Sequence, residues 1–324
     1  MKTLKKILKT IVIILLVVVV VVGGWWVYVR YIADNPKSKA LTLIPEDAVF
    51  VVITSDLTEA WTEISDSKVW NFLIKNPYFK DVNKDIEDLN KYLKNSKVAS
   101  FILTDRDLLM SAHMVSRKDW DFLFVVDLKE VAGTLKSGLK GALGFVDGYK
   151  VTERKYKKQY IVELSANENP KDKIYLCIVN NLLLATFTGS LMEKAIDEKD
   201  KPKWDDNKQF REVTDNLGNR KLFRFLFNYK QLNKFSRAFM AEESGIAKMM
   251  TNSLTYSAFD IGLEDNILAF KGYSGVDSIG SYVKALASVR PGKMQAWKIT
   301  SDQASLYMSI GFSDFNEFYN NCLI

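Results

Sequence analysis

Apolar and polar positions follow three different patterns along this chain. Residues Ile11 to Val29 form an uncharged run that is mostly Val, Ile and Leu. Further on, apolar residues recur three and four positions apart, as at Val82, Ile86, Leu89 and Leu93, which is typical of an amphipathic helix. Elsewhere, short β-branched and aromatic runs end at polar turns, which is typical of strands.

These patterns predict the order of elements. Strands are expected at residues 48–54, 98–103, 108–115, 120–128, 150–164, 174–179, 182–187, 221–227, 254–263, 267–273, 294–300 and 305–310. Helices are expected at residues 57–73, 82–93, 131–143, 190–197, 210–217 and 279–287, and one or two helices over 231–250. Short polar links such as Asn180–Asn181 make neighbouring strands antiparallel. Hairpins interrupted by helices, rather than alternating strands and helices, predict an α+β fold with an antiparallel sheet.

The uncharged run predicts one transmembrane helix over residues 11–30, ahead of the antiparallel-sheet domain. A bilayer core takes about twenty apolar residues to cross, and in lipid a single segment must pair its backbone groups as a helix. The residues that mark this anchor are Ile11, Val22, Gly23, Gly24, Trp25, Trp26 and Val29. A cleaved signal peptide is the alternative, but its apolar core would span about 7–15 residues and end at small residues.

Charges beside the run predict its orientation. Lys2, Lys5, Lys6 and Lys9 precede it with no acidic residue among them, and positive charge is retained on the cytoplasmic side. Arg30, Lys37 and Lys39 weaken this bias without reversing it. The sequence therefore predicts a cytoplasmic N-terminus at residues 1–10, a lipid bilayer contact through residues 11–30, and a main domain outside the cytoplasm.

The amino-acid composition limits the kinds of protein to which the part beyond residue 30 can belong. Residues 1–30 hold five of the 45 basic residues and none of the 39 acidic ones, which leaves 40 basic against 39 acidic residues beyond them. A nucleic-acid-binding domain usually carries a basic surface, so nucleic acid is not an expected partner. With 48% hydrophobic and 12% aromatic residues, the chain can form a core. Its two cysteines are too few for a disulfide scaffold, and Cys177 is expected to be a buried apolar residue.

The domain organisation rests partly on a short internal echo. Residues 55–61 (SDLTEAW) and 313–319 (SDFNEFY) both follow an expected strand and begin a helix with a Ser-Asp cap. A polar stretch after the anchor predicts a spacer at 31–44, and the absence of a Pro-, Gly- or Ser-rich linker predicts one domain at 45–290. The echo adds the start of a second, truncated repeat at 291–324. A rival register aligns Pro45 with Pro291, and coincidence explains the echo equally simply.

The chain resembles a bacterial family, domain of unknown function 3352. The likeness lies in the lysine-led anchor, the residues 44–48 (IPEDA), the strand-to-helix step at 55–61, and the segments 111–128 and 311–320. It covers most of residues 40–320 through motifs of low specificity. The resemblance implies a protein anchored in the bacterial cytoplasmic membrane that faces the cell envelope. It implies no activity and no catalytic residues.

Residues able to carry chemistry are few. His113 is the sole histidine, so a histidine-rich zinc site is excluded. A Ser-His-Asp triad could use His113, but a Gly-x-Ser-x-Gly turn is absent, and a structural strand histidine is the simpler interpretation. Gly138, Gly141 and Gly144 lie within or after an expected helix rather than in a phosphate-binding loop. Acidic pairs are expected to be solvated: Asp119 with Asp121, Asp205 with Asp206, and Glu242 with Glu243. No catalytic, cofactor or metal residue is assigned.

Aromatic rows leave the function open between three classes. Phe223, Phe225 and Phe227 alternate along one expected strand, and Trp120, Phe122 and Phe124 along another. They indicate either a core covered by helices or a cavity for an apolar ligand. The main hypothesis is an envelope protein that binds or scaffolds a protein partner without catalysis. The alternatives are a lipid-binding module and, less simply, a hydrolase that uses paired carboxylates.

Overall fold

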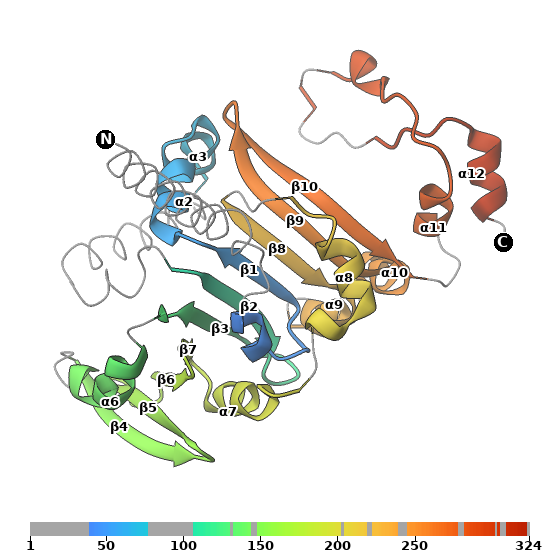
Figure 1. Ribbon diagram of the computed structural model, residues 1–324. Helices are drawn as coiled ribbons and strands as arrows, with labels where there is room; N and C mark the ends of the chain where they lie inside the picture. Colours follow the sequence, from blue (N-terminus) through green and yellow to red (C-terminus); the bar gives the residue numbers. More distant parts are fainter. Residues whose placement is uncertain are drawn as a thin grey trace, which may run out of the picture. The chain divides into compact units, whose positions relative to one another are not determined.

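The computed structural model describes most of the chain beyond residue 38 (Figure 1). It describes residues 39–76, 106–129, 132–143, 148–201, 204–218, 222–238, 245–277, 282–301, 303–304 and 309–322. The chain divides into two units, Met1–Lys39 and Ala40–Ile324. The predicted anchor at 11–30, helix at 82–93 and strand at 98–103 lie outside the described residues. Among the residues that the structure describes, no helix has both the length and the apolar character needed to span a bilayer.

One antiparallel sheet forms the centre of the Ala40–Ile324 unit (Figure 1). Its strands are β1 (Phe50–Thr54), β2 (Leu108–Met114), β3 (Trp120–Asp127), β4 (Tyr149–Tyr156), β5 (Gln159–Ala166), β6 (Lys173–Val179), β7 (Leu182–Thr186), β8 (Phe223–Asn228), β9 (Leu254–Glu264) and β10 (Ile267–Val276). Their order is β10-β9-β8-β1-β2-β3-β7-β6-β5-β4. Every pairing is antiparallel. The predicted α+β class with an antiparallel sheet is therefore confirmed.

Alternation along the central strands gives the sheet two different faces. On the covered face, Val51, Ile53, Leu109, Leu123 and Leu226 are buried in the main core. Against them pack the 3₁₀ helices η2 (Lys39–Leu43) and η4 (Trp204–Asp206) and the helices α7 (Gly189–Glu198) and α8 (Lys208–Thr214). Residues 40, 41, 43 and 44 belong to this core, although the sequence assigns them to a spacer. Through these buried residues, the first segment of the Ala40–Ile324 unit packs against the sheet.

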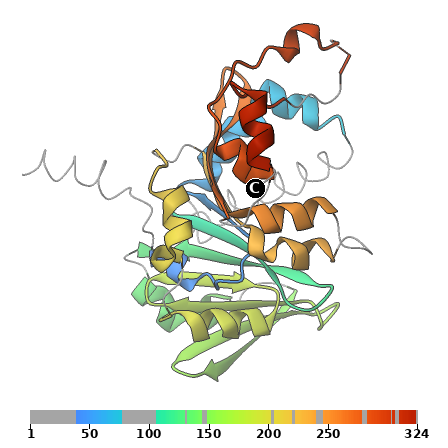
Figure 2. The ribbon, with the colours of Figure 1, turned by 90° about the vertical axis from the view of Figure 1, so that its right-hand side faces the viewer.

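The aromatic face is the opposite face of the same strands. It carries the half-buried side chains of Phe50, Trp120, Phe122, Phe124, Phe225 and Phe227. The 3₁₀ helix η5 (Tyr229–Gln231) leads into α9 (Leu232–Ser236), and α10 (Gly245–Ser253) precedes β9. Figure 2 shows α8 on one side of the sheet and α9 and α10 on the other. The two faces are therefore covered by different parts of the chain.

Of the remaining helices, one expected helix is divided in two and two others agree with the prediction. The helix expected at 57–73 is two helices, α2 (Leu57–Ser65) and α3 (Lys68–Leu73). Ser67 begins the second, because its hydroxyl accepts a hydrogen bond from the N–H of Trp70 at 3.1 Å, which satisfies a free helix donor. Helices α6 (Ala132–Leu143) and α11 (Tyr282–Ala287) lie where they are expected.

Three other expectations are wrong. The single strand expected at 150–164 is the hairpin β4–β5, which turns at Lys157 with a φ of 52°. Helix α7 begins at Gly189, after the cap residue Thr188, and not at Ser190 as the expected range 190–197 implies. Residues 296–299 form the 3₁₀ helix η6 and not a strand. The first two errors concern a turn and a helix cap, whose geometry depends on neighbouring elements as well as on local composition.

The echo between residues 55–61 and 313–319 holds at the level of the helix caps. Asp56 accepts a hydrogen bond from the N–H of Glu59 at 2.9 Å, and Asp314 accepts one from the N–H of Glu317 at 3.4 Å. The second cap begins α12 (Phe315–Cys322). The strand expected at 294–300 ahead of it is absent, and residues 305–308 of the next one lie outside the described residues. A second repeat therefore stays a prediction.

Candidate functional site

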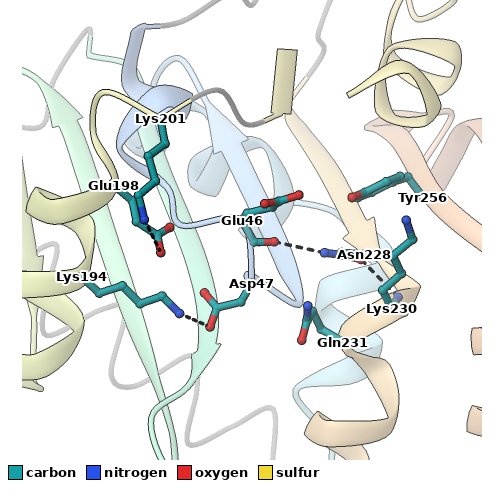
Figure 3. Close-up of a pocket in the computed structure, with 9 residues that line it drawn as sticks. All are labelled: Glu46, Asp47, Lys194, Glu198, Lys201, Asn228, Lys230, Gln231 and Tyr256. Carbon is teal, nitrogen blue, oxygen red and sulfur yellow. Dashed lines mark hydrogen bonds and ion pairs between the residues drawn. The ribbon is translucent and has the colours of Figure 1, made fainter. Parts of the chain in front are cut away.

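A polar pocket lies at the end of the sheet where β1 begins and β8 ends (Figure 3). We call it the Asp47 pocket, and its cavity measures about 410 Å³. It is lined by Glu46 and Asp47 from the turn before β1, Lys194 and Glu198 from α7, Lys201 just beyond α7, Asn228 from β8, Lys230 and Gln231 from η5, and Tyr256 from β9. Four separate stretches of the chain therefore supply its walls.

Asn228 holds two of these walls together. Its side-chain amide donates to the backbone carbonyl of Glu46 at 3.3 Å, and its amide oxygen accepts from the N–H of Lys230 at 3.1 Å. Its own N–H donates to the carbonyl of Val49 at 2.8 Å. Because all three bonds come from one residue at the end of β8, the turn before β1 and η5 are fixed to each other.

Asp47 is the residue of the pocket whose pKa is shifted most strongly. One carboxylate oxygen accepts a hydrogen bond from Nδ1 of His113 at 3.1 Å, and the other is paired with the ammonium of Lys194. Burial by itself would raise the pKa of Asp47, but the hydrogen bonds and charges of His113 and Lys194 together outweigh it and lower the pKa from 3.8 to about 2. The carboxylate is therefore ionised at any physiological pH.

His113 connects Asp47 to a serine inside the sheet. Nε2 of His113 lies 2.9 Å from Oγ of Ser111, two residues earlier on the same face of β2. A carboxylate can only accept, so His113 donates from Nδ1 to Asp47. The order Ser111, His113, Asp47 matches the hydrogen-bonded chain of a serine hydrolase triad.

The burial of Ser111 and His113 argues against a catalytic role for these three hydrogen-bonded side chains. Ser111 and His113 are both 0% exposed, and Ser111 lies in a central strand between Val51 of β1 and Leu123 of β3. Its hydroxyl is also within 3.3 Å of the Leu123 carbonyl. A nucleophile must meet its substrate at hydrogen-bond range, and the Ser111 side chain is fully buried in this structure. The expectation of a structural strand histidine is consistent with this geometry.

The other wall of the pocket carries a cation beside a buried phenol. Nζ of Lys230 lies 5.8 Å from the ring centre of Tyr256 and donates to Oε1 of Gln209 at 3.1 Å. Burial, followed by the charge of Glu46, raises the pKa of Tyr256 despite a hydrogen bond from Asn207. Tyr256 therefore stays protonated and contributes its aromatic face to the pocket.

The two aromatic rows predicted from the sequence meet on the aromatic face. The rings of Phe225 and Phe50 are stacked with centres 5.5 Å apart, and Phe50 contacts Phe122 at 6.4 Å across the small residue Ala112. Phe235 of α9 packs edge-on against Phe50 and Trp120 at 6.2 and 5.7 Å. The rings thus form one continuous cluster that runs across β8, β1 and β3.

Other residues considered from the sequence are dispersed. Asp121 accepts from the Thr186 hydroxyl at 2.8 Å and the Phe187 N–H at 3.1 Å, whereas Asp119 accepts from Ser116 at 2.6 Å. Gly138 lies inside α6, as does Gly141. Cys177 is a buried core residue, as expected, Cys322 is exposed, and neither forms a disulfide. Glu242, Glu243 and Gly144 lie outside the described residues. Among those described, no cluster of three acidic, His or Cys side chains could hold a metal.

Comparisons with known proteins add little to this geometry. No family model and no curated protein matches the chain. Among solved structures, it is similar to crystal form III of TP0453, with 9% sequence identity, a TM-score of 0.34, and coverage of 71% of this chain and 77% of that chain. The predicted membership of domain of unknown function 3352 stays a prediction.

Sequence reasoning identified His113 but not its partners. Lys194 lies 147 positions from Asp47, and Asp47 lies 66 positions from His113. Asp47 follows a proline and a glutamate in a turn, where an acidic residue needs no special explanation. No local spacing connects these side chains, because only the pairing of β1 with β2 and the docking of α7 bring them together.

Proposed function

We propose that this chain is a single-pass protein of the cell envelope, with its N-terminus in the cytoplasm, that binds a partner without catalysis. The anchor at 11–30 and the lysines ahead of it support the location, since both length and charge asymmetry favour a retained helix with this orientation. The near-neutral charge of residues 31–324 favours a protein or small-molecule partner over nucleic acid.

The burial of Ser111 and His113 is the observation that favours a binding function over a catalytic one. Their chain to Asp47 has the connectivity of a hydrolase triad, yet both side chains are 0% exposed. Asp47 in turn presents its second oxygen to Lys194. The hydrogen-bonded side chains of Ser111, His113 and Asp47 thus support the pocket wall from behind. Buried polar networks rigidify a structure in this way when every member has its hydrogen-bond partners.

The charges of the Asp47 pocket favour a partner group that carries both signs. Asp47 neutralises Lys194, and Glu198 lies 4.0 Å from Lys201. Of the six charged groups that line the pocket, Glu46 and Lys230 have no ion-pair partner among the described residues. One carboxylate and one ammonium, both beside Tyr256 in an open pocket, complement a zwitterionic group on the partner.

A photo-crosslinking amino acid at Gln231, a half-buried residue of the pocket wall, tests this proposal. The full chain carrying it is expressed in its own membrane and irradiated. We expect one discrete adduct, and we expect the double substitution Glu46→Gln and Lys230→Gln to remove it, because both unpaired charges are then lost.

The matched control places the same crosslinker at Lys158, an exposed residue of the β4–β5 hairpin. This position should give no adduct of the same mass. An identical adduct from both positions, or a Gln231 adduct unaffected by the double substitution, would contradict binding at the Asp47 pocket. Hydrolysis of an ester probe that is abolished by Ser111→Ala would contradict the absence of catalysis.

A further inference from the structure

A second pocket, distinct from the Asp47 pocket, lies on the aromatic-face side of the molecule. We call it the basic pocket. It measures about 480 Å³ and is lined by Met114 at the end of β2, Ser116 and Arg117 in the turn that follows, and Lys234 and Arg237 of α9 and its C-terminal end. Ligand pockets commonly fall between about 300 and 1,000 Å³, so this one is large enough for part of a small molecule.

Three cations converge on the basic pocket from two elements. Arg117 and Lys234 are exposed, and neither has an ion-pair partner within the described ranges. Asp119 is the acidic residue of the same turn, but its carboxylate accepts from Ser116 at 2.6 Å and does not line the pocket. The described lining therefore carries three positive charges and no negative one, which favours an anion.

Met114 is the apolar side chain of the pocket lining and lies beside the aromatic cluster. Met114 is half-buried and pairs across the strands with Trp120, whose ring centre lies 5.7 Å from that of Phe235. Phe235 follows Lys234 on α9 and packs against Trp120, whereas Lys234 itself lines the pocket. A simple phosphate ion would use the cations and leave this apolar side without a contact, whereas an amphiphile would use both.

We propose that the basic pocket binds an anionic phospholipid. Its phosphate lies among Arg117, Lys234 and Arg237, since guanidinium groups pair with phosphate oxygens through two parallel hydrogen bonds. Its acyl chain lies along Met114 toward Trp120, and tryptophan is a residue that favours the boundary between polar headgroups and hydrocarbon. This site is independent of the Asp47 pocket and of the partner proposed for it.

Native mass spectrometry of the full chain in a non-ionic detergent tests this site. The protein is mixed with phosphatidylglycerol, phosphatidylcholine or glycerol phosphate, and retained adducts are counted. We expect preferential retention of phosphatidylglycerol. Each basic residue near a lipid headgroup is worth roughly a fivefold gain in affinity, so the triple substitution Arg117→Gln, Lys234→Gln and Arg237→Gln should lower retention by at least about tenfold.

The matched control removes three exposed lysines of β4 and the β4–β5 turn, Lys150→Gln, Lys155→Gln and Lys158→Gln, and should retain the lipid like the unaltered chain. Lys2, Lys5, Lys6 and Lys9 are present in every variant, so lipid held by the N-terminus cancels in the comparison. Equal retention by the triple variant, or equal retention of phosphatidylcholine, overturns the proposal. Glycerol phosphate bound as tightly as phosphatidylglycerol overturns the assignment to a lipid.

Discussion

At the scale of single residues, Asp47 is the position on which the candidate site depends. Its carboxylate joins the turn before β1 to His113 of β2 and to Lys194 of α7. A hydrogen bond to a charged group contributes more than one between neutral groups, and a buried charge that loses its partner is costly. The same three side chains that shape the pocket wall therefore also contribute to the stability of the fold.

This coupling predicts a pH dependence of stability. The pKa of Asp47 is about 2 in the folded protein against an ordinary value of 3.8, so the unfolded chain binds the proton more readily. The contribution of Asp47 is therefore present above about pH 4 and is lost as the pH falls toward about 2. Its size is on the order of 2 kcal/mol.

Asp47→Asn should remove this contribution. Urea unfolding at about pH 7 should show a loss on the order of 2 kcal/mol relative to the unaltered chain, and the difference should shrink at about pH 2.5. Asp200→Asn is the control, because the Asp200 side chain is 86% exposed and lies 3.8 Å from its nearest cation, Lys199. A difference between Asp47→Asn and the unaltered chain that stays constant over this pH range would refute the role given to Asp47.

At the scale of elements, the pairing of β8 with β9 depends on a buried ion pair. Arg224 donates to both carboxylate oxygens of Asp260, at 2.7 and 3.0 Å, and to the carbonyl of Gly218 at 2.7 Å. The two residues face each other across the strands. Arg224 is 2% and Asp260 8% exposed, so either charge has little access to water if its partner is removed.

Arg224→Met should destabilise the protein by about 3–5 kcal/mol, because it leaves the Asp260 carboxylate buried without a counter-ion. Lys271→Met is the matched control on the neighbouring hairpin, where Lys271 and Glu264 form an exposed pair at 2.7 Å. That change should cost less than about 1 kcal/mol. Denaturant unfolding of both variants measures the difference, and similar losses for the two would show that burial does not set the strength of the Arg224 pair.

At the scale of the whole molecule, the proposed orientation depends on the charges on either side of the proposed anchor at residues 11–30. With Lys2, Lys5, Lys6 and Lys9 on the cytoplasmic side, residues 31–324 would be exported. The open pockets on the Ala40–Ile324 unit would then face the envelope, where a partner or lipid can reach them. Both proposed binding sites require this location to meet the ligands assigned to them.

A reporter enzyme that is active only outside the cytoplasm, fused after Ile324, tests the orientation. The unaltered chain should give high activity. Changing the four N-terminal lysines to glutamate should lower it strongly, because Arg30, Lys37 and Lys39 then supply the larger positive charge on the other side of the run. Changing Lys150, Lys155, Lys158 and Lys171 to glutamate gives a control with the same change of charge. A silent reporter on the unaltered chain would reverse the proposed topology.

Local patterns in the sequence were sufficient for most of the sheet. The strands β1, β2, β3, β6, β7, β8, β9 and β10 lie within a few residues of their expected positions, because alternation and short turns are properties of neighbouring residues. The expected hairpin at Asn180 is confirmed by its φ of 57°. Lys157 escaped detection because lysine is uncommon at a positive φ, and only the pairing of β4 with β5 holds it there.

The sequence by itself determined the class of the fold, the antiparallel hairpins, the aromatic rows and the charge asymmetry around residues 11–30, since all of these are set by period and composition along the chain. Only the tertiary structure decided which residues share a site. Asp47, His113 and Lys194 meet because β1 pairs with β2 and α7 packs on the covered face, and Arg117 meets Lys234 because α9 lies on the other side. Such contacts depend on the order and docking of distant elements, which a local pattern does not encode.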